Sequence, residues 1–347
     1  MQLTYYLVLM ILSVLLSLGY ALLWKKERST PLTVLFIMFP LANIGYLIFS
    51  LSQNLEEALG AERLVYLAGC FAGYFVMAYI LDFCKVEIPK AFRMIYFLFS
   101  AVLYLGAAFN GYLNVFYLYV YFHREDDFVW LTRGTGFMFY GFFALNFVYM
   151  LMNFTILIYS LVKQKDVSRL LVALLLITEC ALGGAFVVEQ FLYGDIQFSA
   201  AAFVLAQIIF LILLGIEKRY NVSLVEDDTF GPVSETGVMT FDKSFHYLGS
   251  NEKAKDIIPE LMEVKVDSSA SHDTFLKEQP YEWLKTYKET GSSSATYTKG
   301  HTVYNVDVEL LDEGPVKNIY RVSLWEQKGR PATPAEEVAD ELPGEEI

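Results

Sequence analysis

Cysteine and histidine are both scarce in this sequence, which has three cysteines and four histidines among 347 residues. Cys70, Cys84 and Cys180 lie within or beside apolar stretches, and no pair shows the Cys-x-x-Cys spacing of a metal site. They are therefore predicted to be small core residues, and neither a metal ion nor another cofactor is expected. The absence of cysteine after residue 225 also excludes a flavin held through a thiol adduct in that part of the chain.

Charged residues are almost absent from seven long stretches in the first two-thirds of the chain. These are, roughly, Leu3–Trp24, Leu32–Leu51, Leu64–Phe83, Met94–Phe109, Gly136–Val162, Leu170–Tyr193 and Phe198–Ile216. About 20 apolar residues cross the hydrocarbon core of a bilayer as a helix, and most of these stretches reach that length. The sequence therefore predicts an all-α seven-helix transmembrane bundle over residues 1–220.

Basic residues are unevenly distributed among the connections between these stretches. They cluster in alternate connections and after the last stretch, as Lys25, Lys26, Arg28, Lys85, Lys90, Arg93, Lys163, Lys165, Arg169, Lys218 and Arg219. The other connections hold only Arg63, Arg124 and Arg133. The positive-inside rule places the richer set in the cytoplasm. We therefore expect a multi-pass protein of the cell membrane with an extracellular N-terminus and a cytoplasmic C-terminal region.

Positive charge is scarce after residue 225, where 12 basic residues stand against 25 acidic ones. This excess of negative charge equals the net charge of the whole chain, −13. Such acidity argues against binding to nucleic acid and against docking on an anionic membrane surface. A protein partner or a small ligand therefore remains as the expected binding partner of this part of the chain.

Four polar residues are expected close to the bilayer midplane, namely Asn43, Asn146, Glu179 and Gln207. At about 1.5 Å per residue, each lies near the middle of its stretch. If the last three helices pack together, Glu179 is expected to hydrogen-bond to Gln207 or Asn146. Polar side chains are costly in hydrocarbon unless they are hydrogen-bonded or serve a function. These four residues are therefore expected to form either a polar clamp between helices or a functional site, which would be a ligand pocket or a protonatable switch.

A second polar group is expected near the outer face of the membrane. Glu189 and Gln190 end the sixth stretch, and a long outer loop from Asn110 to Arg133 is rich in aromatic residues around His123 and Arg124. Such a loop is typical of an interfacial belt, a short helix or a hairpin lying on the bundle. The functional alternative is a lid over a pocket for a small amphipathic ligand.

Short strand-like segments replace the apolar stretches from about residue 233. Two strands are expected in GVMTFD and SFHYLGSN, followed by a helix from near Asn251, a helical middle containing Trp283, and a C-terminal hairpin. This order resembles the opening of a PAS domain and predicts a small cytoplasmic α+β module over residues 233–327. The resemblance implies a pocket lined by apolar strand residues such as Phe241, Phe245, Val306 and Ile319.

Two segments of different composition flank this module. Residues 221–232 are expected to be a linker, and the Pro-rich acidic residues 328–347 to be a disordered tail. The short exit after the seventh stretch, EKRYN, leaves little slack between the last helix and the first strand.

The membrane part resembles a known family. Its seven stretches, the IPK at Ile88–Lys90 after the third of them and the short EKRYN exit are similar to the N-terminal seven-transmembrane region of bacterial sensor histidine kinases and diguanylate cyclases. That resemblance implies a sensory membrane domain and relay through the PAS-like module. We expect the assembly to be a homodimer. The sequence shows neither a phosphoacceptor histidine on a dimerising helix nor a GG[DE]EF segment, so we expect no catalysis by this chain. We expect its output to pass through a partner histidine kinase or diguanylate cyclase, or through an enzyme domain that this sequence lacks.

Rival seven-helix functions leave their own sequence traces. A retinal photoreceptor needs a lysine in the last helix, and Phe198–Ile216 has none. A small-solute transporter with a regulatory cytoplasmic domain remains as the alternative to a receptor, although the only proline near the centre of a stretch is Pro40, without a counterpart in the second half. A third possibility is a scaffold whose PAS-like module only mediates association.

Overall fold

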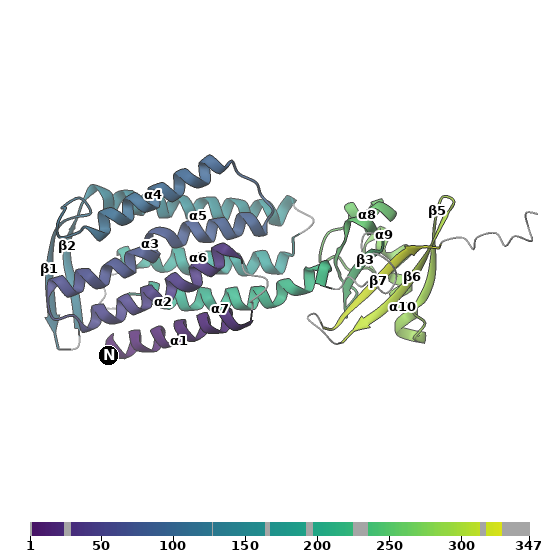
Figure 1. Cartoon of the computed structure of the whole chain (residues 1–347), viewed down its shortest axis with the longest axis horizontal. Helices are drawn as coiled ribbons and strands as arrows, with labels where there is room; N and C mark the ends of the chain where they lie inside the picture. Colours follow the sequence, from purple (N-terminus) through teal and green to yellow (C-terminus); the bar gives the residue numbers. More distant parts are fainter. Residues whose placement is uncertain are drawn as a thin grey trace, which may run out of the picture. The chain divides into compact units, whose positions relative to one another are not determined.

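A computed structural model describes residues 2–23, 29–126, 128–163, 167–191, 197–224, 235–312 and 317–327 (Figure 1). The chain divides into two compact units, Met1–Ile216 and Glu217–Ile347. The predicted acidic tail, most of the predicted linker, the turn at 313–316 and the basic residues of the first connection lie outside the described residues. The two units are described separately below.

The described residues of the first unit form seven helices and one β-hairpin (Figure 1). The helices are α1 (Gln2–Leu23), α2 (Thr30–Leu51), α3 (Leu55–Phe83), α4 (Lys90–Ala108), α5 (Phe137–Lys163), α6 (Arg169–Phe191) and α7 (Ser199–Glu217). Within the described part of the chain, these seven are long and apolar enough to cross a membrane. Large apolar side chains cover their outward faces, as Ile95, Phe99 and Val102 do on α4. The predicted seven-helix membrane part is therefore confirmed.

Helix α3 begins at Leu55, nine residues before the predicted start at Leu64. The cause is a strong N-terminal cap: the Asn54 side chain accepts a hydrogen bond from the Glu57 backbone N–H at 3.0 Å, and the Glu57 carboxylate accepts one from the Gln53 N–H at 2.8 Å. This cap stabilises the polar first turns of α3, which hydropathy alone places before the helix. The extension places Glu62 inside a helix.

The long loop between α4 and α5 forms an antiparallel hairpin of β1 (Tyr117–Glu125) and β2 (Phe128–Thr135). Gln2 of α1 donates to the Val129 carbonyl at 3.1 Å and accepts from the Val129 N–H at 3.0 Å. Arg124 donates to the Ser52 carbonyl after α2 at 2.7 Å. The strands lie across one end of the helices, which we call the hairpin end (Figure 1). A hairpin was one of the forms expected for this loop.

Small residues bring the helices close together. A Cβ on Gly45 of α2 would meet the Ala61 carbonyl of α3 at 2.9 Å, and one on Gly73 of α3 would meet the Tyr149 ring of α5 at 2.7 Å. Close backbone approach of this kind is the usual means of helix association in a bilayer, where the hydrophobic effect contributes little. Helix α7 packs through stacked rings, Phe203 against Phe39 of α2 with centroids 4.8 Å apart.

The second unit is built on one five-stranded antiparallel sheet with the strand order β4-β3-β7-β6-β5. After the short 3-10 turns η1 (Lys218–Tyr220) and η2 (Val222–Leu224), its elements are β3 (Gly237–Asp242), β4 (Tyr247–Ser250), α8 (Glu252–Ile257), η4 (Pro259–Met262), α9 (Thr274–Glu278), α10 (Pro280–Thr290), β5 (Ser294–Lys299), β6 (Thr302–Leu311) and β7 (Ile319–Glu326). The expected small sheet-containing region with a helical middle is present. Asn251 caps α8 by accepting from the Ala254 N–H at 2.9 Å.

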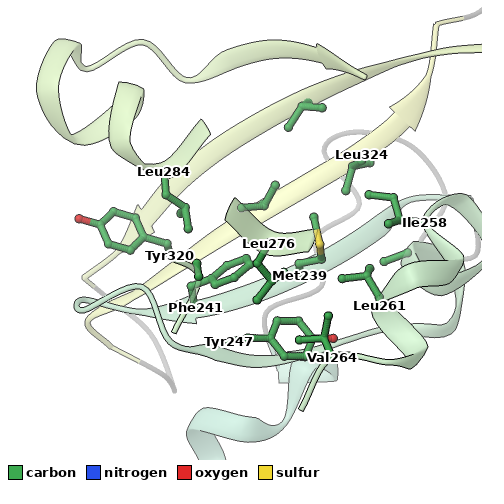
Figure 2. Close-up of a cluster of buried hydrophobic side chains, with 14 of the residues drawn as sticks. Met239, Phe241, Tyr247, Ile258, Leu261, Val264, Leu276, Leu284, Tyr320 and Leu324 are labelled. Atoms are coloured by element: carbon green, nitrogen blue, oxygen red, sulfur yellow. The ribbon is translucent and has the colours of Figure 1, made fainter. Parts of the chain in front are cut away.

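The main core of this unit lies between one face of the sheet and the helices. Figure 2 shows Met239, Phe241, Leu276 and Leu284 pointing toward one another from strand β3 and from helices α9 and α10. The four residues predicted to line one pocket do not share a face: Phe241 and Val306 are buried in this core and Phe245 packs against it, whereas Ile319 lies in a separate cluster. Residue alternation along β7 places Ile319 and Tyr320 on opposite faces.

The separate cluster lies on the opposite face of the sheet and includes the residues that follow α7. Tyr220 and Val222 pack against Val238, Leu248 and Ile319. The Tyr220 hydroxyl also donates a hydrogen bond to the Asp267 carboxylate at 2.8 Å. The segment that leaves the last membrane helix is therefore part of the packed structure of the second unit.

A candidate ligand cavity in the membrane unit

A cavity of about 780 Å³ lies inside the first unit and is lined by the hairpin and by helices α1, α2, α3, α5, α6 and α7. This volume falls within the range of small-molecule sites. Along α5 the lining runs from Phe139 to Asn153, a rise of about 21 Å at 1.5 Å per residue. Much of the wall is aromatic: the Phe143 and Phe186 rings stack with centroids 5.4 Å apart, and Phe142 meets Phe186 edge-on at 5.6 Å.

A largely buried ion pair lines the cavity at the hairpin end. Arg133 of β2 contacts the Glu62 carboxylate of α3 at 2.8 Å and donates to the hydroxyls of Tyr117 at 2.6 Å and Tyr66 at 3.3 Å. The two tyrosine hydroxyls are hydrogen-bonded to each other. These four residues are called the Glu62–Arg133 cluster below.

The protonation states in this cluster follow from its burial and its charges. Burial raises the pKa of Tyr117 to about 12, so this phenol is neutral at physiological pH. Burial by itself disfavours a charged guanidinium, but the adjacent Glu62 carboxylate outweighs it and holds the pKa of Arg133 well above its ordinary value. The second carboxylate oxygen of Glu62, Oε2, is buried and has no hydrogen-bond partner among the described residues.

A second polar pair lies deeper in the cavity. Asn153 of α5 donates through Nδ2 to Oε1 of Glu179 on α6 at 2.8 Å, and both side chains are at most 5% exposed. In the described part of the chain, Oδ1 of Asn153 has no partner. A buried acceptor left unpaired costs on the order of 1–3 kcal/mol, so this atom is a place where a bound donor would be stabilised.

Glu189, also in the cavity lining, joins α6 to the beginning of α7. Its carboxylate accepts from the Ser199 backbone N–H at 2.5 Å and from the Ser199 hydroxyl at 2.8 Å. Ser199 is the first residue of α7. A carboxylate is favourable there because the first backbone N–H groups of a helix lack partners within the helix and carry partial positive charge.

The four residues predicted at the midplane do not form one cluster. Glu179 pairs with Asn153 instead of the predicted Gln207 or Asn146, because Gln207 faces α1 and Asn146 donates to the carbonyl of the preceding helical turn at 3.0 Å. Gln207 accepts from the Ser13 hydroxyl at 2.6 Å and donates to Ser17 Oγ at 2.8 Å.

Two of these four residues line the cavity and two lie outside its lining. Asn146 and Glu179 line it, whereas Gln207 binds α1 and Asn43 is fully buried in α2. Neither side-chain polar atom of Asn43 has a hydrogen-bond partner among the described residues. The interpretation as a clamp therefore fits Gln207, and the interpretation as a pocket fits Glu179 and Asn146.

The residues predicted at the outer face also separate. Glu189 lines the cavity, but His123 and Arg124 do not. The His123 ring stacks on Trp130 of the neighbouring strand with centroids 5.3 Å apart, and Arg124 fastens the hairpin to the residues that end α2. The side chain of Gln190 lies outside the described residues.

Sequence reasoning missed Glu62, Tyr66, Tyr117, Arg133 and Asn153. Glu62 precedes the third apolar stretch and was assigned to a loop, while Arg133 was used only as a charge for topology. The sequence did contain a signal for the Glu62–Arg133 pair, since this acidic and this basic residue precede apolar stretches that begin on the same predicted side of the membrane. A signal for Asn153 was its position seven residues after Asn146, which places both on one helical face.

Comparison with known proteins gives one match. The family model described as the N-terminal 7TM region of histidine kinase matches residues 7–218. These residues include the described cavity lining apart from Gln2 and Tyr6. No curated protein and no solved structure matches the chain.

Proposed function

The chain belongs to the family of N-terminal 7TM regions of histidine kinases, and we propose that it is a sensory receptor in which a small ligand binds in the cavity of the membrane unit. The observation that carries this proposal is the coincidence of a ligand-sized cavity, a buried ion pair at one end and unpaired buried acceptors on its wall. A bundle held together by packing alone has no need of such groups.

The direction of signalling is part of the proposal. The distribution of basic residues favours a hairpin end on the extracellular side and a second unit in the cytoplasm. Ligand would then reach the cavity from outside the cell or from the membrane, beneath the hairpin. Lining residues Ser199, Ala202 and Phe203 belong to the first turns of α7, so an occupied cavity would act on the helix that continues into the second unit.

The relay is proposed to be mechanical and to end in the second unit, which we interpret as a PAS-like module. Its support is the strand order and the continuity of α7 with the segment carrying Tyr220 and Val222, which is packed on the sheet. We propose that the PAS-like module spans residues 233–327. We also propose that the chain forms a homodimer and acts on a histidine kinase or diguanylate cyclase. Replacing residues 217–221 by glycine and serine should abolish the response; an unaltered response would refute direct coupling.

The main experiment fills the cavity. Ala72 of α3 and Ala202 of α7 line it, and both are at most 7% exposed. Ala72→Leu and Ala202→Leu should each change the activity of a kinase or cyclase co-purified from membranes of the native host, measured with labelled nucleotide. Ala173→Leu on the exposed face of α6 is the matched control and should leave that activity unchanged. If the cavity-filling variants fold and signal like the native chain, the receptor proposal is wrong.

The transporter alternative makes a different prediction from the same cavity. A buried carboxyl group such as Glu179 beside a solute-sized space is also a feature of transport sites. Protein reconstituted in liposomes would then move a labelled solute, and Glu179→Ala would abolish that flux. Flux of this kind would favour transport over reception.

A further inference from the structure

The charged groups that line the cavity are unbalanced. Of the described residues in the lining, three carry a carboxyl group, Glu62, Glu179 and Glu189, and one carries a positive charge, Arg133. Arg133 is committed to Glu62 at 2.8 Å, and Glu189 is held by Ser199 at the beginning of α7. Glu179 has an amide as its partner and no basic side chain within ion-pair distance among the described residues.

The unsatisfied atoms of the lining point to the same chemistry. Glu62 Oε2 and Asn153 Oδ1 are both hydrogen-bond acceptors, and their side chains are more than nine-tenths buried. A ligand that completes this wall must therefore donate hydrogen bonds. An anion would bring further acceptors to a place that already has a surplus of them, and a pure hydrocarbon would leave them unpaired.

An ammonium group fits the deep end of the cavity. It has three N–H donors and no acceptor, so it can donate to the Glu179 carboxylate and, once a rotation of the Asn153 side chain exposes this buried atom, to Oδ1 of Asn153 as well. Asn153 Nδ2 already holds the other carboxylate oxygen at 2.8 Å, which orients both acceptors before a ligand arrives. Hydrogen bonds to a charged partner are also stronger than those between neutral groups.

The aromatic wall suits the rest of such a ligand. Phe142, Phe143 and Phe186 form a packed group within the lining, about three turns from Asn153 along α5 and about two turns from Glu179 along α6. Ring faces attract cations and also bury apolar surface. We propose that the cavity binds a small organic ammonium ion with an apolar or aromatic body, its ammonium group on Glu179 and Asn153. This assignment rests on the proposed receptor function.

The test compares three probes that share a 2-phenylethyl body and differ in the head group, together with one ammonium probe whose linker is longer. 2-Phenylethylammonium, 4-phenylbutylammonium, 2-phenylethanol and 3-phenylpropanoate would be titrated by calorimetry into the full chain in nanodiscs of zwitterionic lipid, which does not concentrate cations. We expect saturable binding of at least one ammonium probe and at least tenfold weaker binding of the alcohol and the carboxylate.

Variants of the chain locate the binding site. Glu179→Gln keeps the shape of the side chain and removes its charge, so it should weaken ammonium binding at least tenfold. Glu179→Asp keeps the charge and should retain most of the binding, which separates loss of charge from loss of folding. Glu56→Gln, an exposed substitution outside the lining, should leave binding unchanged.

Three results would overturn the assignment. They are tighter binding of the alcohol or the carboxylate, unchanged ammonium binding in folded Glu179→Gln, and no saturable binding of any of the four probes. None of these decides the receptor function, which is tested by the effect of Ala72→Leu and Ala202→Leu on signalling. A wrong ligand class and a wrong function therefore give different outcomes.

Discussion

The Glu62–Arg133 pair makes a demanding prediction about the stability of the membrane unit. Glu62→Gln would leave the Arg133 guanidinium with two phenol oxygens and no carboxylate in a site where its side chain is 24% exposed. Removing one partner of a buried ion pair costs about 3–5 kcal/mol, because the remaining charge stays desolvated and uncompensated. We expect a loss of this size in the free energy of unfolding, measured by titrating the purified chain in mixed micelles with a denaturing detergent.

A double-mutant cycle and an exposed pair make this prediction refutable. Glu62→Gln with Arg133→Gln removes both charges and leaves two amides able to bond to each other, so the double variant should be more stable than either single one. The Arg93–Asp82 pair, at 3.2 Å with side chains 32% and 50% exposed, is the control, and Asp82→Asn should cost at most about 1 kcal/mol. If Glu62→Gln costs no more than Asp82→Asn, burial does not govern this pair and the reasoning is wrong.

Three further predictions concern single buried side chains. Asn43→Leu should leave the stability of the membrane unit unchanged or raise it by about 1 kcal/mol, because the amide has no described partner; a clear loss in the same unfolding assay would contradict this. Gln207→Leu should cost about 1–2 kcal/mol because it removes the hydrogen bonds to α1, and a neutral result would argue against a clamp. In the second unit, Leu284→Ala should cost about 2–5 kcal/mol, while Met262→Ala, 56% exposed, should cost far less; equal losses in thermal unfolding would show that the core is misplaced.

The membrane helices could be predicted from the sequence because hydrocarbon demands a long apolar segment at each crossing. The length and number of the apolar stretches therefore predict the number of membrane helices and their approximate positions. The start of α3 could not be found in this way, because its first turns are polar and depend on the cap at Asn54. In the second unit, Val306 was predicted to face the interior and is buried, as is Val308 two residues later, since a strand half-covered by a core repeats every two residues.

The candidate site was less predictable for a physical reason. Depth along a helix follows from counting residues, so Glu179 and Asn146 could be selected as polar groups near the middle of apolar helices, and both line the cavity. Which faces of two helices meet depends on rotation about each axis, and one helical position turns a side chain by about 100°. Glu179 therefore pairs with Asn153, seven positions from the predicted Asn146, and Gln207 turns to α1. The hairpin brought Arg133 to Glu62 through tertiary packing, which no local pattern encodes.

Helix α7 is the part of the bundle best placed to carry a change from the cavity. Its most apolar window is 56% buried, against 17% for α1 and for α4, so other helices cover far more of its surface than they do of those two. Its first residue is held by Glu189 of the cavity wall, and further along Gln207 fixes it to α1. A ligand that moves Glu189 or Phe203 would therefore displace α7 near its beginning against an anchor near its middle. Since an interhelical anchor favours rotation or tilt over free sliding, Gln207→Leu should alter the signalling response to cavity filling as well as stability.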